Sequence, residues 1–231
     1  MNTRLRGTLC GIGAAVCYGT NPLGAINLYN DGISASATLF YRFALACLTL
    51  GIMMAVQRKS FVVTRRELGI LALLGVFMST SSTTLYFSFL FMDVGVASTL
   101  LFVYPVMVAV IMATMFKEKV TKTTILAITL ALAGIALLNR SGDGTALSLW
   151  GVTLVMLSSL TYAVYIVVVN KSPLRMSSVK LTFYVLFFGM FTILGYTLVL
   201  GEQIQWLTTP RQWAYALQLA WVPTVLSLVL M

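Results

Sequence analysis

Six consecutive hydroxyl residues, Ser79 to Thr84, lie inside a stretch that is otherwise almost wholly apolar. A hydroxyl group donates and accepts hydrogen bonds, so such a cluster could bind a polar solute or line a hydrated cavity. Each hydroxyl could instead bond the backbone carbonyl one turn earlier. Six residues cover about 1.7 helical turns, so some must face neighbouring helices. The spacing i, i+3, i+4, i+7 puts four residues on one face, which we expect to line a polar cavity: Ser79, Ser82, Thr83 and Tyr86.

Three prolines interrupt apolar segments, at Pro22, Pro105 and Pro223. Proline has no backbone donor and leaves a carbonyl one turn earlier without its helical partner. In membrane transporters such breaks expose backbone groups that can bind a solute. Asn21 and Tyr104, which precede two of these prolines, can supply a compensating or substrate-directed hydrogen bond. A kink that serves only packing is the alternative at each position.

Arg42 is the only basic residue well inside a predicted span. A charged side chain at the bilayer centre costs about 2.5–3.5 kcal/mol on insertion scales. It could neutralise an anionic or zwitterionic solute, or it could make a fixed contact with an acid such as Asp31 or Asp93. Aromatic residues with polar edges suit a cavity wall as well as a core, and they complete the candidate solute-binding set: Tyr18, Tyr162, Tyr165 and Trp221.

The sequence lacks the residues that several enzyme classes require. It contains no histidine, no phosphate-binding GxxxxGK[ST], no GxSxG and no metal-ligand spacing. We therefore expect no catalytic residues, no metal and no cofactor. All six acids lie at or near predicted span ends, so we expect facilitated or exchange transport rather than proton coupling: Asp31, Glu67, Asp93, Glu118, Asp143 and Glu202.

The elements that must hold these residues are membrane helices. Hydrophobic residues make up 59% of the chain and charged residues 9%, with a mean hydropathy of +0.95, whereas soluble domains contain about 25% charged residues. A helix needs about 20 apolar residues to cross the bilayer. The sequence therefore predicts an all-α, polytopic membrane protein with eight spans: 7–28, 34–56, 68–91, 94–116, 123–138, 148–169, 179–200 and 212–231.

The net charge of +9 does not indicate a nucleic-acid partner, because the basic residues are concentrated in alternate loops between the predicted spans. The loops that alternate with the basic ones contain only Arg140 and Arg211. The positive-inside rule thus predicts a cytoplasmic N-terminus in a bacterial-type cytoplasmic membrane. The twelve basic residues on the predicted cytoplasmic side are Arg4, Arg6, Arg58, Lys59, Arg65, Arg66, Lys117, Lys119, Lys122, Lys171, Arg175 and Lys180.

An offset of 144 residues aligns the first three predicted spans with the last three. Because five spans fill one period, the second copy enters the membrane from the opposite side, which makes the repeat an inverted one. We expect a first repeat at 1–144 and an incomplete second repeat at 145–231. Two full periods need about 288 residues, so we expect a truncated protein with eight of ten helices.

Residues 95–138, GVASTLLFVYPVMVAVIMATMFKEKVTKTTILAITLALAGIALL, resemble the end of the first repeat of EamA-type carriers in the drug/metabolite transporter superfamily. The matching features are Tyr104-Pro105, Glu118 at the cytoplasmic end and Gly134 in the closing helix. The stretch GIGAAVCYGTNP at 11–22 and the Arg-Phe pair at 42 and 43 also resemble that family.

This resemblance implies two inverted five-helix repeats around a central cavity, and export of small metabolites or amino acids. The expected partners are a small solute and the lipid bilayer, with no nucleic acid, and a homodimer is left open. Two other functions remain as alternatives. The chain could be a non-transporting membrane subunit, or an intramembrane enzyme acting on lipid-linked substrates, although the sequence contains no converging acid/base pair for such chemistry.

Overall fold

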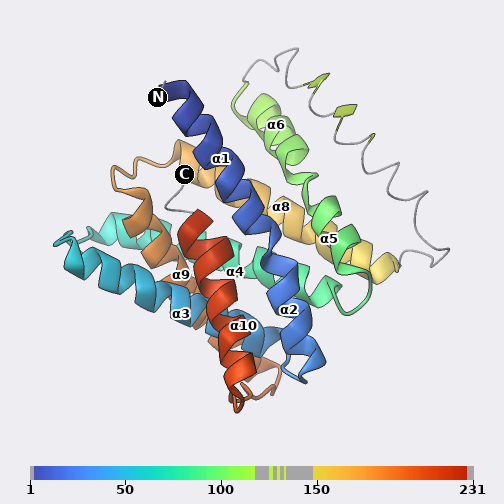
Figure 1. Ribbon diagram of the computed structural model, residues 1–231. Coiled ribbons are helices and arrows are strands. Elements are labelled where there is room, and N and C mark those ends of the chain that lie inside the picture. The colour runs from blue at the N-terminus through green and yellow to red at the C-terminus, as the bar shows by residue number, and fades with distance from the viewer. Residues whose placement is uncertain (1–2, 118–124, 127–128, 131–132, 134–147, 228–231) are drawn as a thin grey trace. The chain divides into compact units, whose positions relative to one another are not determined.

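The computed structural model describes residues 3–117, 125–126, 129–130, 133 and 148–227 (Figure 1). Every regular element in these ranges is helical. The elements are α1 (Thr3–Gly19), α2 (Asn21–Asn30), α3 (Ala35–Val56), α4 (Arg65–Ser88), α5 (Val94–Leu101), α6 (Tyr104–Met115), α8 (Leu149–Lys171), α9 (Ser178–Val199), α10 (Pro210–Ala220) and the π-helix η1 (Trp221–Leu226).

Five of these stretches are long and apolar enough to cross a membrane: α3, α4, the α5–α6 stretch Val94–Met115, α8 and α9. They coincide with five of the predicted spans, and the chain is a multi-pass membrane protein. The first predicted span is divided at Thr20 and the last changes helix type after Ala220. The predicted span 123–138, with Glu118, lies largely outside the described residues, so the number of eight spans stays a prediction.

Side-chain caps explain where several helices begin. The hydroxyl groups of Ser34, Ser148 and Ser177 accept hydrogen bonds from backbone amides in the first turns of α3, α8 and α9. Thr209 and Gln212 form a capping box at the start of α10. Each cap satisfies an amide that has no partner within the helix, and it therefore sets the residue at which the apolar run becomes helical.

Contacts divide the chain into two compact units, Met1–Ser79 with Leu174–Met231, and Thr80–Pro173. The division falls inside α4, so these units are not the predicted repeats. The compact units are defined by which residues lie close together. The predicted repeats are defined by the 144-residue offset in the sequence, so the two divisions need not agree. The proposed division at residues 144 and 145 therefore stays a prediction.

In the first unit α3 packs along α9, and α10 packs against α2 and α3. A Cβ atom on Gly189 of α9 would lie 2.8 Å from Cε2 of Phe43, and one on Gly24 of α2 would lie 2.5 Å from Cγ of Leu219. Both distances are too short for a side chain, so the two glycines permit these close helix contacts. In the second unit α8 packs against α5 and α6.

Candidate functional site

The hydroxyl run lies in the C-terminal half of α4, and several of its hydroxyls bond their own helix. Ser79 is fully buried and donates to the carbonyl of Val76 at 3.0 Å. Thr84 donates to the carbonyls of Thr80 at 2.9 Å and Ser81 at 3.1 Å. These local bonds satisfy the hydroxyl groups without a solute or a second helix, which is why such residues are tolerated in lipid.

Ser81 instead joins two helices. Its hydroxyl donates to the carbonyl of Ser158 on α8 at 3.0 Å, and the Ser158 hydroxyl donates to the carbonyl of Ser81 at 2.7 Å. Both side chains are buried. The sequence predicts that some hydroxyls face another helix, but it does not identify these two. The available signal was a second hydroxyl pair, Ser158 and Ser159, inside an apolar span.

The remaining members of the predicted cavity face pack within the second unit. Ser82 is buried and Thr83 is half-buried. Tyr86 is fully buried, with its ring centroid 5.4 Å from that of Phe89. A solute-binding role for this face stays a prediction.

The Tyr104-Pro105 pair begins α6 after a two-residue interruption that separates it from α5. Pro105 cannot donate to the carbonyl of Leu101, four residues earlier. The hydroxyl of Ser159 on α8 donates to this carbonyl at 3.2 Å, and Ser159 is fully buried. A side chain from another helix therefore replaces the backbone donor that proline removes.

Three predicted aromatic residues come together beside this break. The ring centroids of Tyr104 and Tyr162 lie 4.9 Å apart with their planes at 85°, and those of Tyr162 and Tyr165 lie 5.7 Å apart and stacked. Edge-to-face and offset pairs of this kind stabilise packing by about 0.5–1.5 kcal/mol beyond area burial. The cluster brings residues from the fourth and sixth predicted spans to one place.

At Pro22, α1 ends at Gly19 and α2 begins at Asn21. The hydroxyl of Thr20 donates to the carbonyl of Cys17 at 2.7 Å and accepts from Nε2 of Gln218 on α10 at 3.2 Å. Asn21 is buried, and Tyr18 in the last turn of α1 is half-buried. Gln218 thus links the interruption to α10, and nothing in the sequence pattern indicates this contact.

At Pro223 the regular helix α10 gives way to the π-helix η1. The carbonyl of Leu219, which Pro223 cannot bond, accepts the hydroxyl of Thr224 at 3.2 Å. Arg42, only 3% exposed, donates from Nε to the same hydroxyl oxygen at 3.2 Å. Trp221 is half-exposed and donates from Nε1 to the hydroxyl of Thr49 at 3.1 Å. A buried cation therefore contacts an irregular helix.

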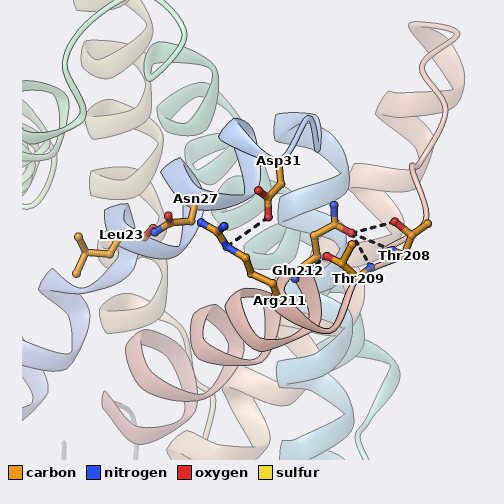
Figure 2. A network of polar contacts seen from close by, with 7 residues as sticks. All are labelled: Leu23, Asn27, Asp31, Thr208, Thr209, Arg211 and Gln212. Carbon is orange, nitrogen blue, oxygen red and sulfur yellow. Dashed lines mark hydrogen bonds and ion pairs between the residues drawn. The ribbon is translucent and has the colours of Figure 1, made fainter.

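The two acids considered as fixed partners of Arg42 make other contacts. Asp31 lies 4.0 Å from Nε of Arg211, as Figure 2 shows. Asp93 caps α5 by accepting from the amides of Gly95 and Val96. Tyr215, and to a smaller extent Asp31, raises the pKa of Arg211, so this guanidinium stays charged.

Within the described part of the chain, no three histidine, cysteine or acidic side chains gather where they could hold a metal ion. The cysteines Cys10, Cys17 and Cys47 are free thiols. The candidate residues fall into both units. The first contains Tyr18, Asn21, Arg42, Ser79, Trp221, Pro22 and Pro223, and the second contains Ser82, Thr83, Tyr86, Tyr104, Tyr162, Tyr165 and Pro105.

Long apolar helices interrupted at prolines, with buried polar groups at the interruptions, define a multi-pass helical membrane protein of the transporter type. The chain belongs to the EamA-like transporter family, whose model matches residues 5–140, more than half of its length. It is thus a member of the drug/metabolite transporter superfamily, as its sequence motifs predict.

A solved structure titled only "Crystal structure of protein" is similar to this chain with a TM-score of 0.72 and 15% sequence identity. The alignment covers 97% of this chain and 77% of that chain. At this identity the likeness shows a shared fold. No curated protein matches the sequence significantly.

Proposed function

We propose that this protein is a secondary transporter that exports or exchanges small polar metabolites or amino acids by alternating access between two inverted repeats. The proposal combines the family membership with the interrupted helices. The observation that carries it is the relation between α3 and α9. An offset of 144 residues moves α3 (Ala35–Val56) to 179–200, within one residue of α9 (Ser178–Val199).

The packing of these two helices supports an inverted relation. Gly189 of α9 lies against Phe43, near the start of α3, whereas Phe183, earlier in α9, lies against Gly51, later in α3. The two helices are therefore antiparallel. An antiparallel contact between equivalent helices is the arrangement expected where a two-fold axis in the membrane plane relates inverted repeats.

A pair of hydrogen bonds supports the same relation. The hydroxyl of Ser81 donates to the carbonyl of Ser158 at 3.0 Å, and that of Ser227 donates to the carbonyl of Ala14 at 3.2 Å. Ala14 and Ser158 are separated by the repeat offset. Each bond joins the third predicted helix of one repeat to the first of the other. Equivalent carbonyls therefore receive hydroxyl donors from equivalent helices, although the two donors differ by two positions, since the offset aligns Ser81 with Val225.

The proposed solute site consists of the interruptions and their polar neighbours. Arg42 would neutralise an anionic or zwitterionic solute, and the hydroxyl face of α4 would bond its polar groups. The tyrosines Tyr104, Tyr162 and Tyr165 would form part of the wall, because their rings combine apolar faces with polar edges.

Transport is tested with the purified protein in liposomes. A panel of amino acids and small organic anions is first screened for thermal stabilisation, since a ligand that binds only the folded state raises apparent stability. Counterflow of the best radiolabelled compound should exceed that of empty liposomes. The triple variant Ser79→Ala, Ser82→Ala, Thr83→Ala should weaken affinity by about tenfold or more, as loss of several hydrogen bonds predicts.

Thr84→Ala is the matched control for this variant, because the Thr84 hydroxyl belongs to the same run and bonds its own helix but lies off the face formed by Ser79, Ser82 and Thr83. It should leave affinity unchanged. If the triple variant keeps the parent's flux and affinity, the site assignment is wrong. If no compound undergoes counterflow, the transport proposal itself fails.

The proposal includes a cytoplasmic N-terminus in the cytoplasmic membrane. In a background without native cysteines, Thr3→Cys places a single thiol near the start of the first predicted repeat, and Ala146→Cys places one just after its end. A membrane-impermeant maleimide added to intact cells should react with the second and not with the first. Reaction of both from one side would rule out an inverted repeat.

A further inference from the structure

Two short loops follow the paired helices: residues 57–64 after α3 and residues 200–209 after α9. The hydroxyl of Tyr184 on α9 donates to the carbonyl of Phe61 in the first loop. The hydroxyl of Tyr41 on α3 donates to the carbonyl of Gln205 in the second loop, at 3.1 Å. Phe61 and Gln205 are separated by 144 residues, which is the repeat offset. Equivalent loop carbonyls are thus held by tyrosines from the opposite repeat.

The attachment of loop 57–64 to α9, here called the α9 tether, has a second polar bond and an aromatic contact. Nζ of Lys180 donates to the carbonyl of Val62 at 2.6 Å. The rings of Phe61 and Phe183 meet edge to face with centroids 5.6 Å apart.

The attachment of loop 200–209 to α3, here called the α3 tether, has two further polar bonds. The amide of Ser34 donates to Oε1 of Gln205 at 2.6 Å, and the hydroxyl of Ser36 donates to Oε2 of Glu202 at 2.6 Å. The ring of Tyr41 also packs edge to face on Trp213 of α10, with centroids 5.9 Å apart.

Because α3 and α9 are antiparallel, the two tethers lie at opposite ends of this helix pair. Each tethered loop leads directly into the third helix of a repeat, α4 or α10. Figure 2 shows the start of α10, where Arg211 approaches Asp31 at the end of α2, and Oε1 of Gln212 accepts from the amides of Thr208 and Thr209 within the capping turn. A movement that carries loop 57–64 away from α9, or loop 200–209 away from α3, would have to break the corresponding tether.

We propose that the α3 and α9 tethers are opposed gates, each of which holds one end of the transporter closed, and that the transport cycle releases them one at a time. This inference rests on the proposed alternating access. The tethers suit repeated opening because most of their bonds end on loop carbonyls at exposed or half-buried positions, where water can replace the lost partner. A single such bond changes the equilibrium between the closed and open states of a gate by about fivefold, which is small enough for both states to be populated.

The test is hydrogen–deuterium exchange of the full-length protein in lipid nanodiscs, followed by mass spectrometry of peptides covering residues 57–64 and 200–209. Tyr41→Phe should raise exchange in 200–209 by about fivefold and lower it in 57–64. Tyr184→Phe should do the reverse, because release of one gate favours the state in which the other is closed. Both substitutions keep the aromatic ring, so the apolar packing is preserved.

The double variant Tyr41→Phe, Tyr184→Phe should return the ratio of exchange in the two loops to within about twofold of the parent. Tyr215→Phe is the control, since Tyr215 packs on the same core cluster as Tyr41 while its hydroxyl lies outside the tether. It should leave hydrogen–deuterium exchange unchanged in both loops.

If each single variant loosens only its own loop and the double variant loosens both, the tethers are static anchors and the proposal is overturned. The measurement needs no transported compound. If exchange shifts in opposite directions in the two loops but no compound undergoes counterflow, the coupling of the two tethers is supported and the proposed transport is rejected. If a compound undergoes counterflow but exchange in the two loops does not shift in opposite directions, the proposed transport is supported and the gates are rejected.

Discussion

At Pro105 the carbonyl that loses its helical donor is bonded by a different helix, whereas at Pro223 it is bonded by the residue that follows the proline. Ser159 of α8 supplies the first hydroxyl, and Thr224 supplies the second. Thr224 also accepts a hydrogen bond from Arg42, so the break at Pro223 is coupled to a buried cation. A carbonyl that proline deprives of its backbone donor is therefore bonded by a side chain from another helix in one case and by a neighbouring residue in the other.

We expect this difference to separate a packing role at Pro105 from a functional role at Pro223. A hydroxyl from another helix holds two helices together and leaves little of the freed backbone for a solute. A local hydroxyl that also contacts Arg42 links the irregular helix to a buried charged side chain. Changes near Pro223 should thus affect transport and stability together, while changes near Pro105 should act mainly on stability.

The largest effect is expected from Arg42→Ala. It removes a buried hydrogen bond to Thr224 and most of a long side chain, and it should lower the free energy of unfolding by about 2–3 kcal/mol. Counterflow activity should be lost. The stability measurement is unfolding in mixed detergent micelles. Arg211→Ala, at an exposed site, should change neither quantity appreciably. Full activity of Arg42→Ala would show that the residue has no role in binding.

Thr224→Val should have the next largest effect and lower the free energy of unfolding by about 1.5 kcal/mol. Valine has nearly the shape of threonine but offers Arg42 no acceptor and the Leu219 carbonyl no donor. Thr224→Ser keeps the hydroxyl and should retain stability and transport. Equal behaviour of the valine and serine variants in the same unfolding assay would show that the hydroxyl does not couple Arg42 to η1.

Ser159→Ala should lower the free energy of unfolding by about 1 kcal/mol, because it leaves the Leu101 carbonyl without a donor. The cost should fall to near zero in a Pro105→Ala background, where the backbone amide of residue 105 can bond that carbonyl. A double-mutant cycle on unfolding free energies measures this coupling. Additive effects of the two substitutions would contradict the assigned role of Ser159.

The smallest stability effect, under about 0.5 kcal/mol, is expected for Ser79→Ala, since its hydroxyl bonds only a carbonyl of its own helix. Counterflow of the same variant separates the two roles of Ser79. Reduced affinity with unchanged stability would support its place in the solute site. A loss of stability comparable to that of Ser159→Ala would show a packing contact instead.

Much of the helical layout could be predicted from the sequence. Long apolar runs predict the helices α3, α4, α8 and α9 closely, because the bilayer thickness sets their length. Proline chemistry predicts interruptions beside Pro22 and Pro105, and the helices there begin at Asn21 and Tyr104.

The partners at each interruption could not be predicted. Ser159, Thr224 and Gln218 are polar residues in apolar segments, and nothing in the spacing indicates which carbonyl or side chain each one meets. The hydroxyl run illustrates the same limit. Its composition predicts both local bonds and bonds between helices, but only packing decides that Ser79 bonds its own helix while Ser81 bonds Ser158.

The amino-acid sequence by itself determined that this chain is a multi-pass helical membrane protein of the EamA-like family, since hydropathy and proline positions act within single segments. Only the tertiary structure decided that Arg42 contacts Thr224, that Ser159 bonds the carbonyl freed by Pro105, and that the carbonyls of Phe61 and Gln205 are bonded at opposite ends of the α3–α9 pair. These contacts join residues far apart in the chain. They form because buried polar groups in an apolar interior must find whichever partner the packing of the helices brings within reach.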